Sequence, residues 1–253
     1  MKYWDPDGIR LAIAIPTYNE AENIKLLVRE IKTITMMGHI QCTIFIIDDN
    51  SPDGTGEIAD KLAKKETSSF FKVKVMHRKE KNGLGSAYID GFKEILKGKY
   101  THVMQMDADF SHNPKYIPLF LEAAKNSDFV VGSRYIKNGG TPDWPFHRKS
   151  LSKLGNMYVR AFLGSKIHDY TGGFNLYSKS LLQKIPLDSV SANGYEFLMA
   201  LKYHALQYVD SATEVPIVFL DRKHGKSKMP KMTIVKTIML VPRIRSRLTS
   251  GGR

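Results

Sequence analysis

Several classes of protein are excluded by what this 253-residue sequence lacks. It has one cysteine, Cys42, so it can form neither an intrachain disulfide nor a cysteine-based zinc site. Its eight histidines are scattered, with no pair at metal-ligand spacing. It contains no run of about 18 apolar residues, and its first residues, MKYWDPDG, lack the apolar core of a signal peptide. We therefore expect a soluble or peripheral protein in a reducing compartment.

Two common phosphate-binding motifs are also absent. Gly83-Leu84-Gly85 resembles the start of the dinucleotide fingerprint G-x-G-x-x-G, but the last glycine is replaced by Tyr88. No Walker A pattern occurs either, which excludes a P-loop ATPase. We interpret the two glycines as allowing a tight turn before a helix.

Positive charge is abundant but unevenly distributed. The chain has 38 Lys and Arg against 25 Asp and Glu, a net charge of +13. Residues 222–253 contain ten of the basic residues and no acidic one, so this stretch carries +10 and the preceding 221 residues only +3. Such a basic end is either a solvated tail or a surface that meets phosphates on nucleic acid, lipid or substrate.

Short β-branched runs alternate with helical patterns through the first half of the chain, which predicts an α/β fold with a mostly parallel sheet. The expected strands are 11–15, 43–47, 72–76, 101–106 and 129–132, and the expected helices are 21–34, 53–65, 85–96 and 114–125. The second half is more elaborate: a loop at 138–143, helices at 147–163 and 195–204, and strand-like pieces at 174–177 and 215–220. No linker of domain-separating length is evident, so we expect one domain.

Acidic side chains follow several of the predicted strands. Asp107 and Asp109 come directly after one of them, and Asp48 and Asp49 end another. Because ligands of open parallel sheets bind beyond the carboxyl ends of the strands, we expect adjacent strand ends to bring these carboxylates, and Arg134 after the strand 129–132, to one edge. Two close carboxylates suit a hard divalent cation such as Mg²⁺ or Mn²⁺. The alternative for each pair alone is a turn or helix-cap role.

An ordered set of motifs resembles glycosyltransferase family 2. The set comprises Pro16-Thr17-Tyr18-Asn19-Glu20, Asp48 to Thr55, Gly83-Leu84-Gly85, Met106-Asp107-Ala108-Asp109, Gly132-Ser133-Arg134-Tyr135, Thr171-Gly172-Gly173-Phe174 and Arg222 to Lys228. Within the family it looks most like the dolichol-phosphate (polyprenol-phosphate) mannosyltransferases, over roughly residues 10 to 230. The resemblance implies a GT-A fold, Rossmann-like with a mostly parallel sheet flanked by helices, with a catalytic domain over residues 1–230.

The resemblance also implies an activity, the inverting transfer of mannose from GDP-mannose to dolichyl or polyprenyl phosphate. It assigns the donor nucleotide sugar to Pro16, Tyr18, Glu20, Asp48, Asp107, Ala108, Asp109, Arg222 and Lys228. It assigns the metal, Mg²⁺ or Mn²⁺, to Asp107 and Asp109. Ser111 is a candidate third ligand at a position where some relatives carry a glutamine. The acceptor phosphate is assigned to Arg134, Arg148 and Lys226, and Asp169 is expected to touch the sugar or to cap a turn.

The chemistry of this reaction favours cations over a general base. A phosphate monoester has a second pKa of about 6 and is largely dianionic at neutral pH, so it needs no deprotonation to attack. Charge develops on the leaving nucleotide, which requires a metal and basic side chains near the diphosphate. We therefore assign catalysis to Asp107, Asp109, Arg134 and Arg222, with Lys226 and Lys228 as helpers on a loop.

The last residues, 231–253, mix apolar and basic residues and are predicted to form an amphipathic helix and tail. Such a helix is typical of membrane-surface binding, and the alternative is a helix packed on the domain. With the resemblance, we expect a peripheral protein on a cytoplasmic membrane face, of the endoplasmic reticulum in a eukaryote or the plasma membrane in a prokaryote. A membrane-spanning partner subunit could provide the attachment instead.

Three other functions are weighed against this one. A UDP-glucose:polyprenyl-phosphate glucosyltransferase would keep the fold and the acceptor. A basic nucleic-acid-binding protein is disfavoured, because the basic stretch lacks interleaved aromatics and no nucleic-acid module is present, so no nucleic-acid partner is expected. A non-catalytic partner subunit is disfavoured by the presence of Asp107, Asp109 and Arg222.

Overall fold

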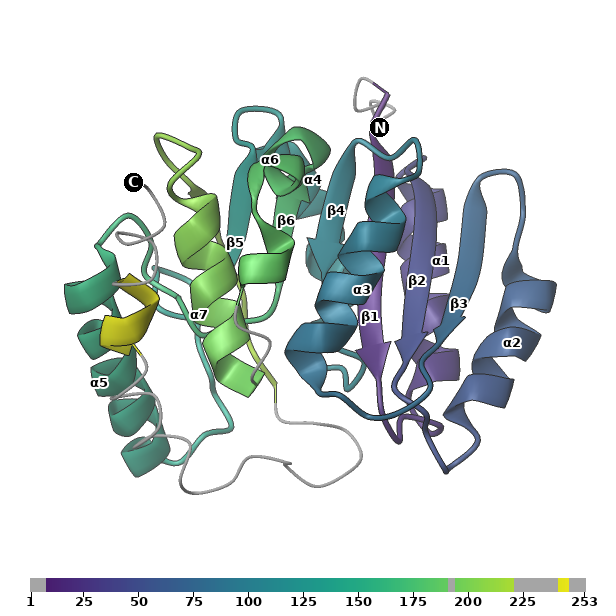
Figure 1. The fold of residues 1–253 in the computed structure, drawn as a ribbon, viewed down its shortest axis with the longest axis horizontal. Coiled ribbons are helices and arrows are strands. Elements are labelled where there is room, and N and C mark those ends of the chain that lie inside the picture. Colours follow the sequence, from purple (N-terminus) through teal and green to yellow (C-terminus); the bar gives the residue numbers. More distant parts are fainter. Residues whose placement is uncertain (1–7, 191–193, 221–240, 246–253) are drawn as a thin grey trace.

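A single seven-stranded sheet forms the centre of the molecule, with helices on both of its faces (Figure 1). The computed structural model describes residues 8–190, 194–220 and 241–245. Along the chain the strands are β1 (Arg10–Thr17), β2 (Gln41–Asp48), β3 (Phe71–His77), β4 (His102–Gln105), β5 (Phe129–Ser133), β6 (Asn175–Ser178) and β7 (Thr213–Pro216).

The order of strands across the sheet is β3-β2-β1-β4-β6-β5-β7. Every described pairing is parallel except the two made by β6, which runs antiparallel to both β4 and β5. This confirms the predicted α/β class with a mostly parallel sheet. It also corrects the expectation that the ends of the strands before Asp107 and Arg134 are adjacent, because β6 lies between β4 and β5. Residues just before β6 therefore reach the same edge as residues just after β4 and β5.

Alternating side chains of the central strands pack into two separate hydrophobic clusters, one on each face of the sheet. In β1, Ala12 and Ala14 belong to one cluster, and Leu11, Ile13 and Ile15 belong to the other. The first cluster is closed by apolar residues of α3, α5, α6 and α7, and the second by those of α1, α2 and α4. The described helices are α1 (Ile24–Met37), α2 (Thr55–Glu66), α3 (Leu84–Leu96), α4 (Ile117–Ala124), α5 (Phe146–Leu163), α6 (Lys179–Lys184) and α7 (Gly194–Ala205).

Most predicted elements occur within a few residues of their expected bounds. The predicted helix 114–125 is divided into a 3₁₀ turn, Pro114–Tyr116, followed by α4. The predicted strand 215–220 is shorter than expected, since β7 ends at Pro216. Helix α6 was not predicted; it begins directly after β6 and is capped by the Ser178 side chain, which accepts from the Leu181 N–H.

The end of the chain is described only for residues 241–245, which are helical. Val241 and Ile244 are buried in the cluster that also holds Val159 and Leu163 of α5, and an Arg245 Nη donates to the Phe162 carbonyl at 3.2 Å. For these residues the structure shows the packing alternative rather than membrane contact. The predicted boundary at residue 230 and the rest of the predicted amphipathic helix lie outside the described residues.

Within the described part of the chain, no helix is both long and apolar enough to span a membrane.

Candidate active site at the carboxyl edge of the sheet

The carboxyl ends of β1, β2 and β4 lie side by side, because β1 pairs with both of the other strands. Thr17 and Asp48, the last residues of β1 and β2, are register partners. The segment from Asp107 to His112 follows β4 at the same edge. For these three strands, the order of the sheet thus brings the carboxylates to one edge, as predicted.

Asp107 and Asp109 differ in how the protein holds them. The Asp107 carboxylate is one-third exposed and accepts a 3.0 Å hydrogen bond from the buried Tyr88 hydroxyl. Burial and the negative charge of Asp107 raise the pKa of Tyr88 well above its ordinary value, so this hydroxyl remains a donor. Asp109 is 5% exposed, and its Oδ1 accepts from both the Ser111 N–H, at 3.1 Å, and the Ser111 hydroxyl, at 2.6 Å. Ser111 therefore orients Asp109.

These two acids fit a divalent cation shared with a substrate better than a metal held by protein alone. No group of three or more His, Cys, Asp or Glu suited to a metal occurs among the described residues. Mg²⁺ commonly uses one or two carboxylates and takes its remaining ligands from phosphates and water. Space beside Asp107 depends on a glycine: a Cβ at Gly173 would lie 3.6 Å from both Asp107 carboxylate oxygens and 3.2 Å from His112 Cε1.

His112 supports Asp107 from behind and was not predicted as a site residue. Its ring is 1% exposed, stacks on Phe174 at 5.0 Å between centroids, and its Nδ1 accepts the Asp107 N–H at 2.9 Å. Burial lowers the pKa of His112, although Asp107 and Asp109 oppose this effect. The neutral tautomer with the proton on Nε2 is the one that can accept at Nδ1.

The residues assigned to the donor base lie at the ends of β1 and β2. Asp48 is buried and accepts from the Thr17 hydroxyl at 3.2 Å and the Ser51 hydroxyl at 2.6 Å. Glu20 accepts from the Asn23 amide at 2.8 Å, and the Lys81 ammonium lies 3.7 Å from the centre of the Tyr18 ring. Pro16, the next-to-last residue of β1, is partly exposed, and Ala108, between the two acids, is buried.

Asp49, in contrast, has a structural role. It is buried, forms an ion pair with Arg78, and accepts the Gly83 N–H at 3.2 Å. Arg78 also binds Asp90 at 3.0 Å. Asp49 therefore has the turn role that was the alternative to metal binding. It links the end of β2 to the loop before α3 that contains Gly83.

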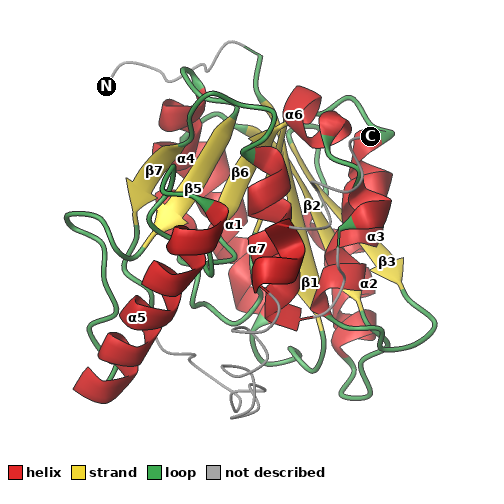
Figure 2. Ribbon diagram, turned by 60° about the vertical axis from the view of Figure 1, so that its left-hand side comes forward, coloured by secondary structure: helices red, strands yellow, loops and turns green. Residues whose placement is uncertain are grey.

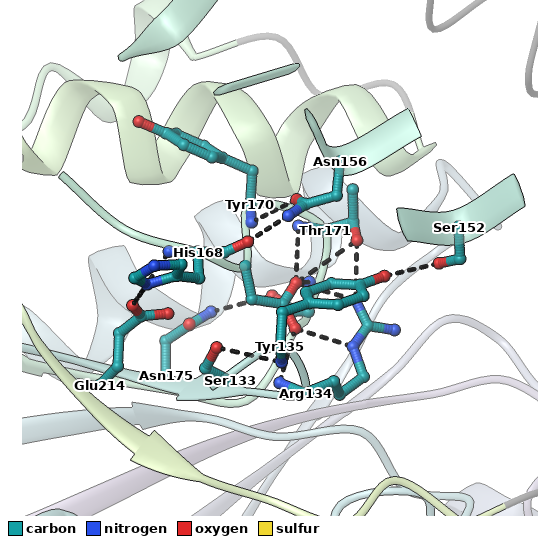
Figure 3. A network of polar contacts seen from close by, with 12 residues as sticks. Ser133, Arg134, Tyr135, Ser152, Asn156, His168, Tyr170, Thr171, Asn175 and Glu214 are labelled. Atoms are coloured by element: carbon teal, nitrogen blue, oxygen red, sulfur yellow. Dashed lines mark hydrogen bonds and ion pairs between the residues drawn. The ribbon is translucent and has the colours of Figure 1, made fainter. Parts of the chain in front are cut away.

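Arg134 follows β5 and is held by the buried carboxylate of Asp169. Figure 3 shows Arg134 within the surrounding network of polar contacts. Its Nε and one Nη donate to the two oxygens of Asp169, each at 2.8 Å, and the same Nη donates to the Thr171 hydroxyl at 2.7 Å. Asp169 is fully buried and also accepts the Gly172 N–H at 3.0 Å. Burial raises the pKa of Asp169, but the positive charges of Arg134 and Lys202 more than offset this and hold it well below its usual range.

Lys202 of α7 completes this buried network. Its side chain is fully buried, and its Nζ donates to the main-chain oxygen of Asp169 at 2.6 Å. Burial lowers the pKa of Lys202 to about 8, although the charge of Asp169 opposes the shift. The Arg134 guanidinium is thus fixed in one orientation by Asp169 and Thr171 of the segment before β6, and Lys202 of α7 in turn holds the main chain of that segment.

An aromatic cluster connects the two candidate acceptor arginines to the residues around Asp107. Arg148, in the first turn of α5, lies with its guanidinium carbon 3.9 Å from the Trp144 ring centre, and that of Arg134 lies 5.9 Å from the same ring. Phe219 packs against both Trp144, at 5.7 Å, and His112, at 5.9 Å. The two arginines assigned to the acceptor are therefore brought together, and packed side chains link them to the support of Asp107.

The functional residues that sequence reasoning missed are Tyr88, His112, Lys202 and Trp144. Only His112 had a signal in its neighbourhood, because it ends the segment that follows β4. Asp169, which was expected to touch the sugar or to cap a turn, is the partner of Arg134 and also caps the turn. Three predicted site residues, Arg222, Lys226 and Lys228, lie outside the described residues.

A sequence model of the glycosyl transferase family 2 matches residues 12–186. The chain belongs to glycosyltransferase family 2. Among the relatives of this family 2 chain, a polyprenol monophosphomannose synthase of Mycolicibacterium smegmatis is 41% identical over 94% of the chain and 89% of the relative. An undecaprenyl-phosphate mannosyltransferase of Micrococcus luteus is 37% identical over 93% of each. The predicted resemblance to polyprenol-phosphate mannosyltransferases is confirmed by these two.

Solved structures show that this family 2 chain has the GT-A type of fold. Mannosyl-3-phosphoglycerate synthase from Rubrobacter xylanophilus matches with a TM-score of 0.70 at 17% identity, covering 97% of this chain and 76% of that one. Glucosyl-3-phosphoglycerate synthase of Mycobacterium tuberculosis, in complex with Mn²⁺, UDP and glucosyl-3-phosphoglycerate, matches with a TM-score of 0.66 at 16% identity, covering 95% of this chain and 80% of that one. At such identity the likeness concerns the fold alone.

Proposed function

We propose that this chain transfers mannose from GDP-mannose to a polyprenyl phosphate, dolichyl phosphate in a eukaryote, with inversion at the anomeric carbon. The observation that carries the proposal is that two carboxylates and two arginines lie at one edge, where an aromatic cluster links the arginines to His112, the support of Asp107. The names of the two relatives, both mannosyl-transferring enzymes of polyprenyl phosphates, support the sugar and the acceptor.

In this proposal Asp107 and Asp109 hold Mg²⁺ or Mn²⁺ against the donor diphosphate. A bound cation neutralises charge that develops on the departing nucleotide. Tyr88 and His112 fix the Asp107 carboxylate and its backbone, and Ser111 fixes Asp109, so the ligands are oriented before the cation arrives. Ser111 supports Asp109 and is not the preferred third ligand of the metal, because its hydroxyl donates to Asp109.

The guanine and ribose would lie over the ends of β1 and β2. Pro16, Tyr18 and Ala108 offer partly apolar contacts there, and Glu20 and Asp48 offer carboxylates as acceptors for N–H and O–H groups. Burial of Asp48 and its hydrogen bonds from Thr17 and Ser51 keep that carboxylate in one position. A fixed acceptor selects a nucleotide with a matching donor.

The acceptor phosphate would be held by Arg134 and Arg148. As a dianion it attacks the anomeric carbon directly, so the site provides cations that bring two anionic substrates together and needs no general base. The Asp169 carboxylate keeps the Arg134 guanidinium in place. Arg222, Lys226 and Lys228 are proposed to add positive charge from residues outside the described part.

Because the acceptor is a lipid, we further propose that the protein works at a membrane surface, on its cytoplasmic face, alone or with a membrane-spanning partner. The basic residues after position 230 would contribute attraction to anionic headgroups.

The direct test is an extraction assay with the purified chain, Mn²⁺, polyprenyl phosphate and radiolabelled donor. We expect label from GDP-mannose, and not from UDP-glucose, in the organic phase, as a β-linked phosphodiester of the sugar. Asp109→Asn, checked for folding by circular dichroism, should lose the transfer. Transfer of glucose from UDP-glucose, or no transfer from either donor, would overturn the proposed donor or reaction.

A further inference from the structure

Side chains of the segment that follows β2 hold the main chain of the segment that follows β1. The two strands pair with each other and end at the same edge of the sheet, the lower edge in Figures 1 and 2. Three consecutive N–H groups after β1 are each accepted by a side chain that lies 32 to 35 residues further along the chain. The Asn19 N–H is accepted by the Ser51 hydroxyl at 3.1 Å, the Glu20 N–H by the Thr55 hydroxyl at 2.9 Å, and the Ala21 N–H by the Asp53 carboxylate at 3.1 Å.

Thr55 connects the two segments from a fully buried position. Its hydroxyl donates to Asp53 Oδ1 at 2.6 Å while it accepts the Glu20 N–H. A hydroxyl has one proton to donate, and the full burial of Thr55 leaves none of its atoms open to a substrate. Any effect of Thr55 on substrate binding must therefore act through Glu20 and Asp53.

Ser51 has the same arrangement beside Asp48. Its hydroxyl donates to Asp48 Oδ1 at 2.6 Å and accepts the Asn19 N–H, and its own N–H donates to Asp48 Oδ2 at 3.2 Å. Asn19 has a left-handed backbone, with a φ of 56°, which asparagine adopts more readily than most residues. One serine thus holds both the Asp48 carboxylate and the left-handed turn at Asn19.

The Asp53 carboxylate completes the contacts between the two segments. Its Oδ2 accepts the Ala21 N–H, and its Oδ1 accepts both the N–H of Thr55, at 3.1 Å, and the hydroxyl. Partial burial raises the pKa of Asp53, but the hydrogen bonds from Thr55 and Ala21 outweigh this and lower the pKa below its ordinary value. The carboxylate is therefore ionised at neutral pH, which makes it a stronger acceptor.

We propose that Ser51, Asp53 and Thr55 are positioning residues for the nucleoside half of the donor. The segment that they hold carries Tyr18 and Glu20, two of the side chains assigned to the donor base. A main chain that is held in one conformation before the donor arrives has a smaller ordering cost on binding. The identity of the ligand as a nucleoside diphosphate rests on the proposed function.

The diphosphate half of the donor should not depend on these contacts. Asp107 and Asp109, which are proposed to hold the cation, follow β4 and have their own supports in Tyr88 and Ser111. Loss of a positioning contact should therefore weaken binding of the whole nucleotide and leave binding of a base-free diphosphate unchanged. This selective loss distinguishes positioning of the nucleoside from a general loss of structure.

The test is calorimetric titration of the full chain with GDP and with pyrophosphate, each in the presence of Mn²⁺. Thr55→Val has nearly the shape of threonine but leaves the Glu20 N–H without its acceptor, so it should weaken GDP binding about tenfold. Pyrophosphate should bind this variant within about twofold of the wild type, because its site is separate. Thr55→Ser keeps the hydroxyl and should bind GDP within about threefold of the wild type.

Thr35→Val is the matched control, because Thr35 is also fully buried and its hydroxyl donates to the Ile31 carbonyl at 2.8 Å, toward the C-terminal end of α1. Both valine variants are expected to have a lower melting temperature, and only Thr55→Val should have a lower GDP affinity. Unchanged GDP affinity in Thr55→Val would overturn the proposal. An equal loss of pyrophosphate affinity would also overturn it, since Thr55 would then support the whole edge.

A pair of serine variants keeps the proposal testable if Thr55→Val does not fold. Ser51→Ala should weaken GDP binding about tenfold. Ser178→Ala, its control, removes a hydroxyl that accepts the Leu181 N–H at 3.1 Å at the opposite edge of the sheet, and should bind GDP as the wild type does. Equal GDP affinities of these two variants would contradict positioning by Ser51.

Turnover separates a failure of this proposal from a failure of the proposed function. Thr55→Val should raise the KM for GDP-mannose about tenfold and leave kcat within about twofold, because nucleoside contacts are alike in the ground and transition states. If the chain binds UDP in place of GDP, the proposed donor is wrong, and an equal weakening of UDP by Thr55→Val would still support positioning. If the wild type transfers no mannose, the titrations alone decide the role of the three residues.

Discussion

At the scale of single residues, His112 shows how the site depends on groups that touch no substrate. Its Nδ1 accepts the Asp107 N–H while its ring packs on Phe174 and Phe219. A residue with only a packing role could be replaced by any side chain of similar size. A residue that positions Asp107 must keep an acceptor at the place of Nδ1.

Two substitutions separate these roles. The Oδ1 of asparagine can take the place of Nδ1, so His112→Asn should keep Mn²⁺-dependent GDP affinity within about threefold, whereas His112→Leu leaves the N–H without its acceptor, at a cost of about 1 to 3 kcal/mol. Calorimetric titration of GDP with Mn²⁺, together with urea unfolding, measures both effects. Equal loss of affinity in the two variants would mean that the ring itself, and not the hydrogen bond, is required.

Lys202 leads to a prediction about pH. Its pKa in the folded protein is about 8, lowered from 10.5 by burial. Between these two values the unfolded chain binds a proton that the folded chain does not, so the contribution of Lys202 to the free energy of unfolding rises with pH. Lys202→Met removes this group. From pH 8 to pH 10, the free energy of unfolding of the wild type relative to the variant should rise by on the order of 2 kcal/mol.

The measurement is chemical unfolding of both proteins at several values of pH. Other titrating groups are shared and cancel in the difference. A difference that stays constant across this range would show that the Lys202 ammonium does not lose its proton there.

These partners could not be read from the sequence because each pair is distant along the chain. Arg134 and Asp169 are 35 residues apart, and Lys202 lies a further 33 residues on. Asp169 alone has the sequence context of a turn residue, and it does accept the N–H groups of Thr171 and Gly172. A lysine on a helix is usually exposed, so the full burial of Lys202 had no local signal.

At the scale of elements, the ion pair between Arg134 and Asp169 joins the end of β5 to the segment before β6. Asp169 is fully buried and the Arg134 side chain is 6% exposed. Removing one member leaves the other as a buried charge with a missing partner, which commonly costs 3 to 5 kcal/mol, whereas apolar replacement of both members is often much cheaper.

A double-mutant cycle tests this interaction. Arg134→Met and Asp169→Leu should each lower the free energy of unfolding by about 3 kcal/mol or more, and the double variant should lose less than the sum of the two. All three should lose transfer to the polyprenyl phosphate, since the guanidinium is absent or misplaced. Additive losses of stability would show that the pair is not energetically coupled.

Element positions were largely predictable where periodicity was strong. The continuous apolar run of β2 and the 3.6-residue spacing of α1 are strong signals, and both elements are found within three residues of their expected bounds. The place of β6 was not predictable, because four residues carry no signal for a partner or a direction. Its antiparallel insertion between β4 and β5 arises from the tertiary arrangement.

At the scale of the whole molecule, the sheet order explains why one edge collects the site. β1 pairs with β2 and β4, so the segments after these three strands meet, and β6 brings the residues before it to the same edge beside β5. The meeting of the segments after β1, β2 and β4 was predicted from the alternation of strands and helices, which indicates a parallel sheet with its ligand site at the carboxyl ends of the strands. The position of the residues before β6 was not predicted, because it depends on the antiparallel direction of β6. These residues include Asp169, the partner of Arg134.

We propose that the carboxylates at this edge bind a cation and the donor diphosphate, while the acceptor attacks without a general base. The most direct measurement uses Asp107→Asn and compares three quantities with the wild type: Mn²⁺ affinity, GDP affinity in the presence of Mn²⁺, and turnover. We expect all three to fall together, by at least tenfold. Loss of turnover with metal and GDP affinity intact would contradict it, because Asp107 would then act as a base.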